Sequence, residues 1–203
     1  KTIISNCAIE PEIQDMIIFL KKMGCNIDFI GRRKILIIGT KKFRSVTHEI
    51  IFDRIELGTY LIAAALVGKK IIFLKIKPKI INTEIQLLKK MGVKIKVEKN
   101  KITVFESTKL NNINIKTEPY PGFPTDLQAQ IMVLMSKASG TSKITENIFE
   151  NRFMHVPELK RMGAKIITKK NVALISGPTS LSGAEVMATD LRASVSLVIA
   201  ALI

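Results

Sequence analysis

Three short stretches of the sequence carry side chains that could do chemistry together: Tyr120–Asp126, Glu150–Glu158 and Ala188–Arg192. The first delivers a carboxylate, Asp126, to the start of an expected helix. The other two each supply a guanidinium, and guanidinium forks bind phosphate or carboxylate groups bidentately. If the three turns meet, the free N–H groups of helix N-termini also favour an anion. These stretches therefore predict a receptacle for a negatively charged ligand.

Each of these residues also has a simpler interpretation. Asp126 and Asp190 stand where a side chain commonly caps a helix N-terminus, and local sequence alone favours that role for both. Arg152 and Arg192 would then be solvated or paired with such carboxylates, where a surface ion pair contributes only about 0 to 1 kcal/mol. His155 would be hydrogen-bonded to a neighbouring carbonyl group. Spacing alone leaves both interpretations open.

The elements that must position these residues repeat along the chain. A leucine-containing amphipathic stretch ends in Lys or Arg and then Met-Gly three times, at Met23–Gly24, Met91–Gly92 and Met162–Gly163. Cations in the last turn and a glycine just after it are typical of a helix C-terminus. β-Branched runs on either side of a polar turn follow, as in residues 94–97 and 102–105, and they predict a hairpin.

Helix starts form a second repeated feature. Asp53, Thr125 and Thr189 each precede an apolar stretch with helical spacing. Asp53 with Glu56, and Thr125 with Gln128, have the spacing of a capping box. The expected helical stretches are residues 60–67, 129–135 and 193–203.

The repeated unit is helix, strand, helix, strand, strand, with a further strand at Ile113–Lys116 leading into the next copy. Its period of roughly 65 to 70 residues is too long for ankyrin, tetratricopeptide or leucine-rich solenoids. The sequence therefore predicts an α/β domain built from several βαβαββ-like units.

Long ordered motifs carry a resemblance to a known family. They are Phe123–Gln130, Phe149–Leu159, Leu181–Ala184, Ala188–Ser194 and Asp53–Thr59. Through them the chain resembles the UDP-N-acetylglucosamine 1-carboxyvinyltransferases along all 203 residues. The resemblance implies two domains, each an inverted α/β barrel of three similar units. That fold agrees with the repeat found in the sequence.

The resemblance also implies an activity. The family transfers the enolpyruvyl group of phosphoenolpyruvate to the 3-hydroxyl of UDP-N-acetylglucosamine, by addition followed by elimination of phosphate. This is the first committed step of peptidoglycan synthesis, it is cytoplasmic, and it uses neither a metal ion nor an organic cofactor.

Four residues match catalytic positions of the family. Asp126 corresponds to the aspartate that contacts the sugar 3-hydroxyl and is proposed to take its proton, and such a base contributes about 10² to 10⁴-fold. Arg152, Asp190 and Arg192 match residues around the phosphoenolpyruvate site, where the two guanidinium groups would neutralise phosphate and carboxylate. Ile148 matches a nucleotide-sugar contact, made through its backbone.

The domain assignment follows from the same resemblance. Residues 1–50 would be the last unit of the first domain, and residues 51–203 would form the second domain with its C-terminal unit incomplete. We therefore expect a fragment of a longer chain. The family's mobile loop with a catalytic cysteine, its N-terminal lysine–asparagine pair and a C-terminal arginine fall outside it, and neither Cys7 nor Cys25 matches that cysteine. Cys25 follows the predicted cap Gly24 and is expected to be a small core residue. These residues alone are expected to be inactive.

Composition excludes several other classes. Apolar residues make up 47% of the chain, which is too many for a disordered protein. No apolar run reaches membrane-spanning length. Two cysteines without a spaced framework imply neither disulfides nor a zinc site. The protein is thus expected to be soluble. The resemblance implies a monomer that acts on the small molecules UDP-N-acetylglucosamine and phosphoenolpyruvate.

Two other functions compete with this one. The sister enzyme that transfers enolpyruvyl to shikimate 3-phosphate shares the fold, although its motifs differ at the segments above. The net charge of +15 could also indicate a non-catalytic module that binds RNA. However, the basic residues are scattered rather than gathered in a stripe with aromatic residues, so we expect no nucleic-acid partner.

Overall fold

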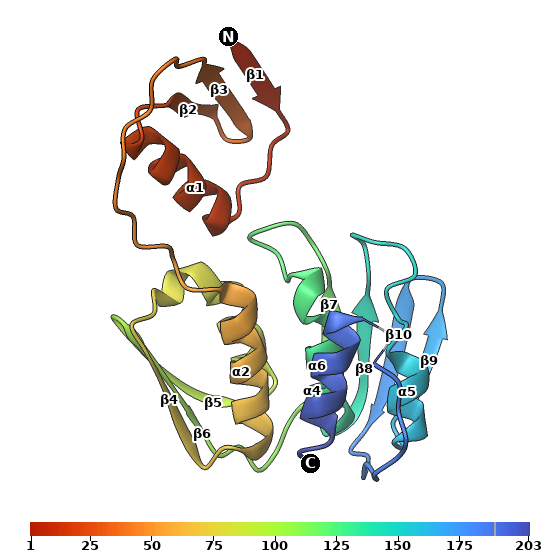
Figure 1. The fold of residues 1–203 in the computed structure, drawn as a ribbon. Helices are drawn as coiled ribbons and strands as arrows, with labels where there is room; N and C mark the ends of the chain where they lie inside the picture. Colours follow the sequence, from red (N-terminus) through yellow and green to blue (C-terminus); the bar gives the residue numbers. More distant parts are fainter. Residues whose placement is uncertain (189) are drawn as a thin grey trace. The chain divides into compact units, whose positions relative to one another are not determined.

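The computed structural model describes residues 1–188 and 190–203, which divide into two compact units, Lys1–Phe52 and Asp53–Ile203 (Figure 1). Thr189, which belongs to the predicted motif Ala188–Ser194 and to the third predicted helix start, lies outside the described residues.

The first unit is a three-stranded sheet with one helix. Its elements are β1 (Thr2–Ser5), α1 (Pro11–Lys22), β2 (Asn26–Gly31) and β3 (Lys34–Ile38). The strand order is β1-β3-β2, and both pairs are antiparallel. Ile17 of α1 packs against Ile27 and Ile35 of the sheet, and half-buried Cys25 lies against this cluster. Cys25 therefore packs on the core, as its small size predicts.

The second unit contains two sheets with helices between them (Figure 1). One sheet has the order β4-β6-β5 and the other β7-β8-β10-β9. Helix α2 contacts β6 and α4, and α4 in turn contacts α6 and β10. All nine residues of α4 are buried, because this helix is predominantly apolar all round. The elements are α2 (Arg54–Val67), β4 (Lys70–Leu74), η1 (Pro78–Ile81), α3 (Asn82–Lys90), β5 (Lys94–Glu98), β6 (Lys101–Phe105), β7 (Asn114–Lys116), η2 (Thr125–Leu127), α4 (Gln128–Ser136), β8 (Gly140–Thr145), α5 (Val156–Arg161), β9 (Lys165–Lys169), β10 (Val172–Gly177) and α6 (Leu191–Ala200).

The predicted repeat is confirmed by the strand pairing. In each of the three sheets, the second strand of a hairpin lies in the middle, antiparallel to both neighbours. The hairpin predicted at residues 94–105 is β5 and β6, with Lys94 opposite Phe105 and Glu98 opposite Lys101. Strand β7 extends its sheet by pairing in parallel with β8, so β7 to β10 complete one βαβαββ unit.

Each copy ends its second helix in the same way. The glycine after the helix has a positive φ in all three copies: Gly24 at 103°, Gly92 at 92° and Gly163 at 97°. The amide of the following residue donates to a carbonyl five residues back, as Val93 N does to Leu88 O at 3.0 Å. This is the Schellman motif, so the predicted helix C-termini are confirmed.

Of the side-chain caps predicted at helix starts, the one at Asp53 is present and the one at Thr125 is absent. Asp53 caps α2, since its Oδ1 accepts hydrogen bonds from Ile55 N at 2.7 Å and Glu56 N at 3.1 Å. The capping box predicted at Thr125 and Gln128 is wrong: a 3-10 turn, η2, precedes α4, and no side chain caps either element.

The final helix is shorter than predicted. It begins at Leu191 and ends at Ala200, rather than continuing to Ile203. A short turn covers the next two residues.

Candidate active site

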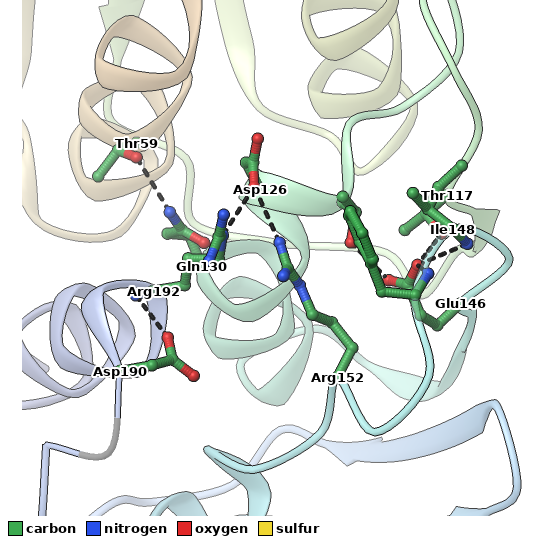
Figure 2. A network of polar contacts seen from close by, with 11 residues as sticks. Thr59, Thr117, Asp126, Gln130, Glu146, Ile148, Arg152, Asp190 and Arg192 are labelled. Atoms are coloured by element: carbon green, nitrogen blue, oxygen red, sulfur yellow. Dashed lines mark hydrogen bonds and ion pairs between the residues drawn. The ribbon is translucent and has the colours of Figure 1, made fainter.

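Three elements of the second unit bring charged side chains to one place (Figure 2). Asp126 lies in η2, immediately before α4. Arg152 comes from the turn between β8 and α5, and Arg192 from the first turn of α6. These are the three turns that the sequence singled out, and the structure places them together.

Asp126 is the centre of this cluster. Its Oδ1 accepts from Arg152 Nη2 at 2.9 Å and from Arg192 Nε at 2.7 Å, as Figure 2 shows. Side-chain exposure is 37% for Asp126, 18% for Arg152 and 42% for Arg192, so the group is open to solvent on one side. Two guanidinium groups share one carboxylate oxygen. Each guanidinium also has further N–H donors for a ligand.

The two aspartates differ in role. Asp126 does not cap a helix, because its carboxylate accepts from the two arginines instead. Asp190 does cap one: its Oδ1 accepts from Arg192 N at 2.7 Å, and its backbone carbonyl accepts from Ser194 Oγ at 2.7 Å. The simpler interpretation is therefore wrong for Asp126 and confirmed for Asp190, whose cap orients the first turn of α6 and with it Arg192.

Arg152 is held from several sides. Its guanidinium carbon lies 4.8 Å from the centre of the Phe149 ring, a cation–π contact. Its Nε is buried and has no hydrogen-bond partner among the described residues. The Phe149 contact and the ion pair with Asp126 together restrict Arg152 more than a surface ion pair alone would.

His155 is buried directly before α5, with 3% of its surface exposed. Burial lowers the pKa of His155 to about 4; nearby Arg152 acts in the same direction, and Asp190 opposes it. The imidazole is therefore neutral at neutral pH. Its Nε2 has no hydrogen-bond partner among the described residues, so the predicted carbonyl partner is absent at that atom.

Ile148 lies in the same turn as Arg152 (Figure 2). Its backbone amide donates to Glu146 Oε1 at 2.9 Å. A backbone contact from Ile148 to a ligand would therefore use its carbonyl oxygen.

A cavity of about 740 Å³ adjoins the charged cluster, between α2, α4 and α6. Asp126 and Arg192 line it together with Thr59 and Gln130, whose Nε2 donates to Thr59 Oγ1 at 3.2 Å. The rest of the lining is largely apolar and includes Val195. A cavity of this size with a few charged groups is typical of a small-molecule site.

Sequence reasoning missed Glu146, whose carboxylate contacts both the Arg152 turn and the segment before Asp126. The sequence feature that could have identified Glu146 is its position, directly after a strand and just before the motif that begins at Phe149. Sequence reasoning also missed the Thr59–Gln130 pair, because its partners are 71 positions apart.

In the described part of the chain, no group of three or more His, Cys, Asp or Glu side chains could hold a metal ion. A search of the same residues finds no helix that is long and apolar enough to span a membrane.

A comparison with protein families matches residues 1–203 to the model described as EPSP synthase (3-phosphoshikimate 1-carboxyvinyltransferase). The chain belongs to this family. Its curated relatives include the UDP-N-acetylglucosamine 1-carboxyvinyltransferases of Pelagibacter ubique (strain HTCC1062), 58% identical over 202 residues, and of Histophilus somni (strain 129Pt), 52% identical over 200 residues. These alignments cover 100% and 98% of the chain but 48% and 47% of the relatives, so the chain spans about half their length. The resemblance drawn from the motifs is confirmed.

Solved structures confirm the fold class. The enolpyruvyl transferase NikO from Streptomyces tendae matches with a TM-score of 0.88 at 28% identity, covering 99% of this chain and 48% of that one. An EPSP synthase from Acinetobacter baumannii matches with a TM-score of 0.72 at 18% identity, covering 99% of this chain and 50% of that one. The helices packed between sheets thus belong to the enolpyruvyl transferase fold.

Proposed function

We propose that this protein transfers the enolpyruvyl group of phosphoenolpyruvate to the 3-hydroxyl of UDP-N-acetylglucosamine and releases phosphate. The observation that carries the proposal is the meeting of Asp126, Arg152 and Arg192 in one open cluster. Relatives at 52% and 58% identity that bear the name of this activity support the choice of substrate.

In this proposal Asp126, Arg152 and Arg192 have different roles in the reaction. Arg152 and Arg192 bind the phosphate and carboxylate of phosphoenolpyruvate with the N–H groups that Asp126 does not use. Asp126 takes the proton of the sugar hydroxyl, and its Oδ2 is the oxygen for this step, because Oδ1 already accepts two hydrogen bonds. The sugar oxygen bonds to C2 of phosphoenolpyruvate while a general acid donates a proton to C3. The conjugate base of that acid then removes a proton from C3 while the C2–O bond to phosphate breaks, which restores the double bond and releases phosphate.

The biological setting follows from the reaction. The product is a peptidoglycan precursor, so the enzyme would act in the cytoplasm and serve cell-wall synthesis, cell shape and division. We further propose that residues 1–50 complete a first domain and residues 51–203 begin a second. The division of the structure between Phe52 and Asp53 supports this assignment. We propose a monomer without nucleic-acid partners.

A ligand test separates the proposal from its nearest rival, transfer to shikimate 3-phosphate, the reaction named in the family description. UDP-N-acetylglucosamine is expected to raise the thermal midpoint of the complete gene product, because a ligand that binds only the folded state stabilises it. Shikimate 3-phosphate is expected to have no effect. The reverse result would assign the protein to the sister activity.

A further inference from the structure

Glu146 is a buried carboxylate without an ion-pair partner among the described residues. It follows β8 directly and is 3% exposed. Its Oε1 accepts from Thr117 Oγ1 at 2.7 Å, Ile148 N at 2.9 Å and Phe149 N at 3.2 Å, and its Oε2 accepts from Thr125 Oγ1 at 2.9 Å. Burying a charge is costly, and these four neutral donors offset the cost.

The backbone of Glu146 is anchored independently of the groups that its side chain holds. Its amide donates to Asn171 O at 2.8 Å, and its carbonyl accepts from Asn171 Nδ2 at 3.0 Å. Asn171 lies in the turn between β9 and β10. The carboxylate is therefore a fixed point on the sheet.

Two separate chain segments are hydrogen-bonded to the Glu146 carboxylate. Thr125, bound to Oε2, immediately precedes Asp126. Phe149, bound to Oε1 through its amide, places its ring under the Arg152 guanidinium at 4.8 Å. A single side chain thus joins the segment that carries Asp126 to the turn that carries Arg152, two residues whose ion pair measures 2.9 Å.

We propose that Glu146 is a positioning residue that sets the separation between Asp126 and Arg152. This role rests on the proposed function, in which Asp126 and Arg152 act on the same substrate pair. Glu146 does not touch the reacting atoms. It acts through geometry, and a misplacement of about 1 Å at a catalytic group can lower turnover about 100-fold.

Two substitutions distinguish geometry from charge. Glu146→Gln keeps the length and one acceptor oxygen, and its amide can donate to the Thr125 hydroxyl oxygen. Glu146→Asp keeps the charge but is one methylene shorter, so it cannot reach both segments. In the complete gene product, kcat is expected to fall about 100-fold for Glu146→Asp and less than about tenfold for Glu146→Gln. The opposite order would overturn the proposal.

The hydrogen bond between Thr125 and Glu146 can be removed without changing the other contacts of Glu146. Thr125→Val removes the hydroxyl bound to Oε2 while keeping the side-chain shape. It is expected to lower kcat at least about tenfold, with KM for phosphoenolpyruvate nearly unchanged. Ser142→Ala is the matched control. Ser142 is also buried and lies in β8, the strand that Glu146 follows, and its hydroxyl accepts from Ile113 N at 3.2 Å. The control is expected to lose stability but keep its kinetics.

The two proposals can fail separately. If the unmodified gene product releases no phosphate from phosphoenolpyruvate with UDP-N-acetylglucosamine, the proposed function is wrong. If it is active but Glu146→Asp and Thr125→Val behave like Ser142→Ala, only the positioning role is wrong. A crystal structure of Glu146→Asp supplies a readout that does not depend on activity: the Asp126–Arg152 pair is expected to separate beyond 4 Å, the usual limit of an ion pair. An unchanged pair would overturn the positioning role.

Discussion

At the scale of single residues, Arg152 has a planar guanidinium group that a lysine at the same position would lack. Arg152 donates to Asp126 with one nitrogen while its flat guanidinium lies over the Phe149 ring. A lysine could supply the charge but neither the planar stacking nor a second directed donor for phosphate. We therefore propose that the shape of Arg152 matters as well as its charge.

The first prediction follows from this shape. Arg152→Lys in the complete gene product is expected to raise KM for phosphoenolpyruvate about tenfold or more, because the bidentate contact is lost. Thermal stabilisation by UDP-N-acetylglucosamine should remain. Arg161→Lys is the control, since Arg161 is 62% exposed and pairs only weakly with Glu158 at 3.4 Å. Equal KM values for both variants would show that Arg152 does not bind phosphoenolpyruvate.

His155 gives a second prediction, on pH. Burial lowers the pKa of His155 from 6.5 in the unfolded chain to about 4 in the folded one. Between these values the unfolded state binds more protons, so stability falls as the pH decreases from about 6.5 to about 4. A shift of this size corresponds to about 3 kcal/mol at most. His155→Asn is expected to flatten this part of the stability profile, measured as thermal midpoint against pH. An identical slope in both proteins would show that another group is responsible.

At the scale of elements, the repeated helix ends were predictable and the site network was not. A helix C-terminus is encoded locally, by Lys or Arg, Met and Gly, so three copies could be read from the sequence. Thr125 illustrates the opposite case. Its spacing to Gln128 matches a capping box, but its hydroxyl donates to Glu146, which lies 21 positions away. A local pattern cannot show a competing partner that only the tertiary fold brings close.

The helix ends supply a third prediction. Gly92→Ala is expected to destabilise the protein by about 1 to 2 kcal/mol or more, because φ is +92° and the new Cβ would lie 2.9 Å from Lys109 O. Gly183→Ala is the control, since nothing lies within 4 Å of its added Cβ and no left-handed conformation is required there. Urea or thermal unfolding measures the difference. Equal stability of the two variants would refute the strained-cap explanation.

At the scale of the whole molecule, the chain spans about half the length of the curated relatives that it matches. The alignments cover 48% and 47% of the length of two curated relatives. The repeated unit could be found in the sequence and the domain assignment came from the family resemblance, whereas the site's ion-pair geometry required three turns to converge in space. Residue types and order could indicate the family; only the fold could show that Asp126 is shared by two arginines.

This limit leads to a fourth prediction. The isolated 203-residue chain is expected to release no phosphate from phosphoenolpyruvate in the presence of UDP-N-acetylglucosamine. A phosphate-release assay of the isolated chain beside the complete gene product tests this expectation. Turnover by the chain alone would mean that the residues matched here suffice.

We propose that Asp126 acts as the base within this cluster. Asp126→Asn keeps the size of the side chain and an acceptor for the arginines but cannot take a proton. In the complete gene product, the rate of phosphate release is expected to fall at least about 100-fold, while UDP-N-acetylglucosamine still raises the thermal midpoint. Turnover equal to that of the unmodified protein would contradict the account.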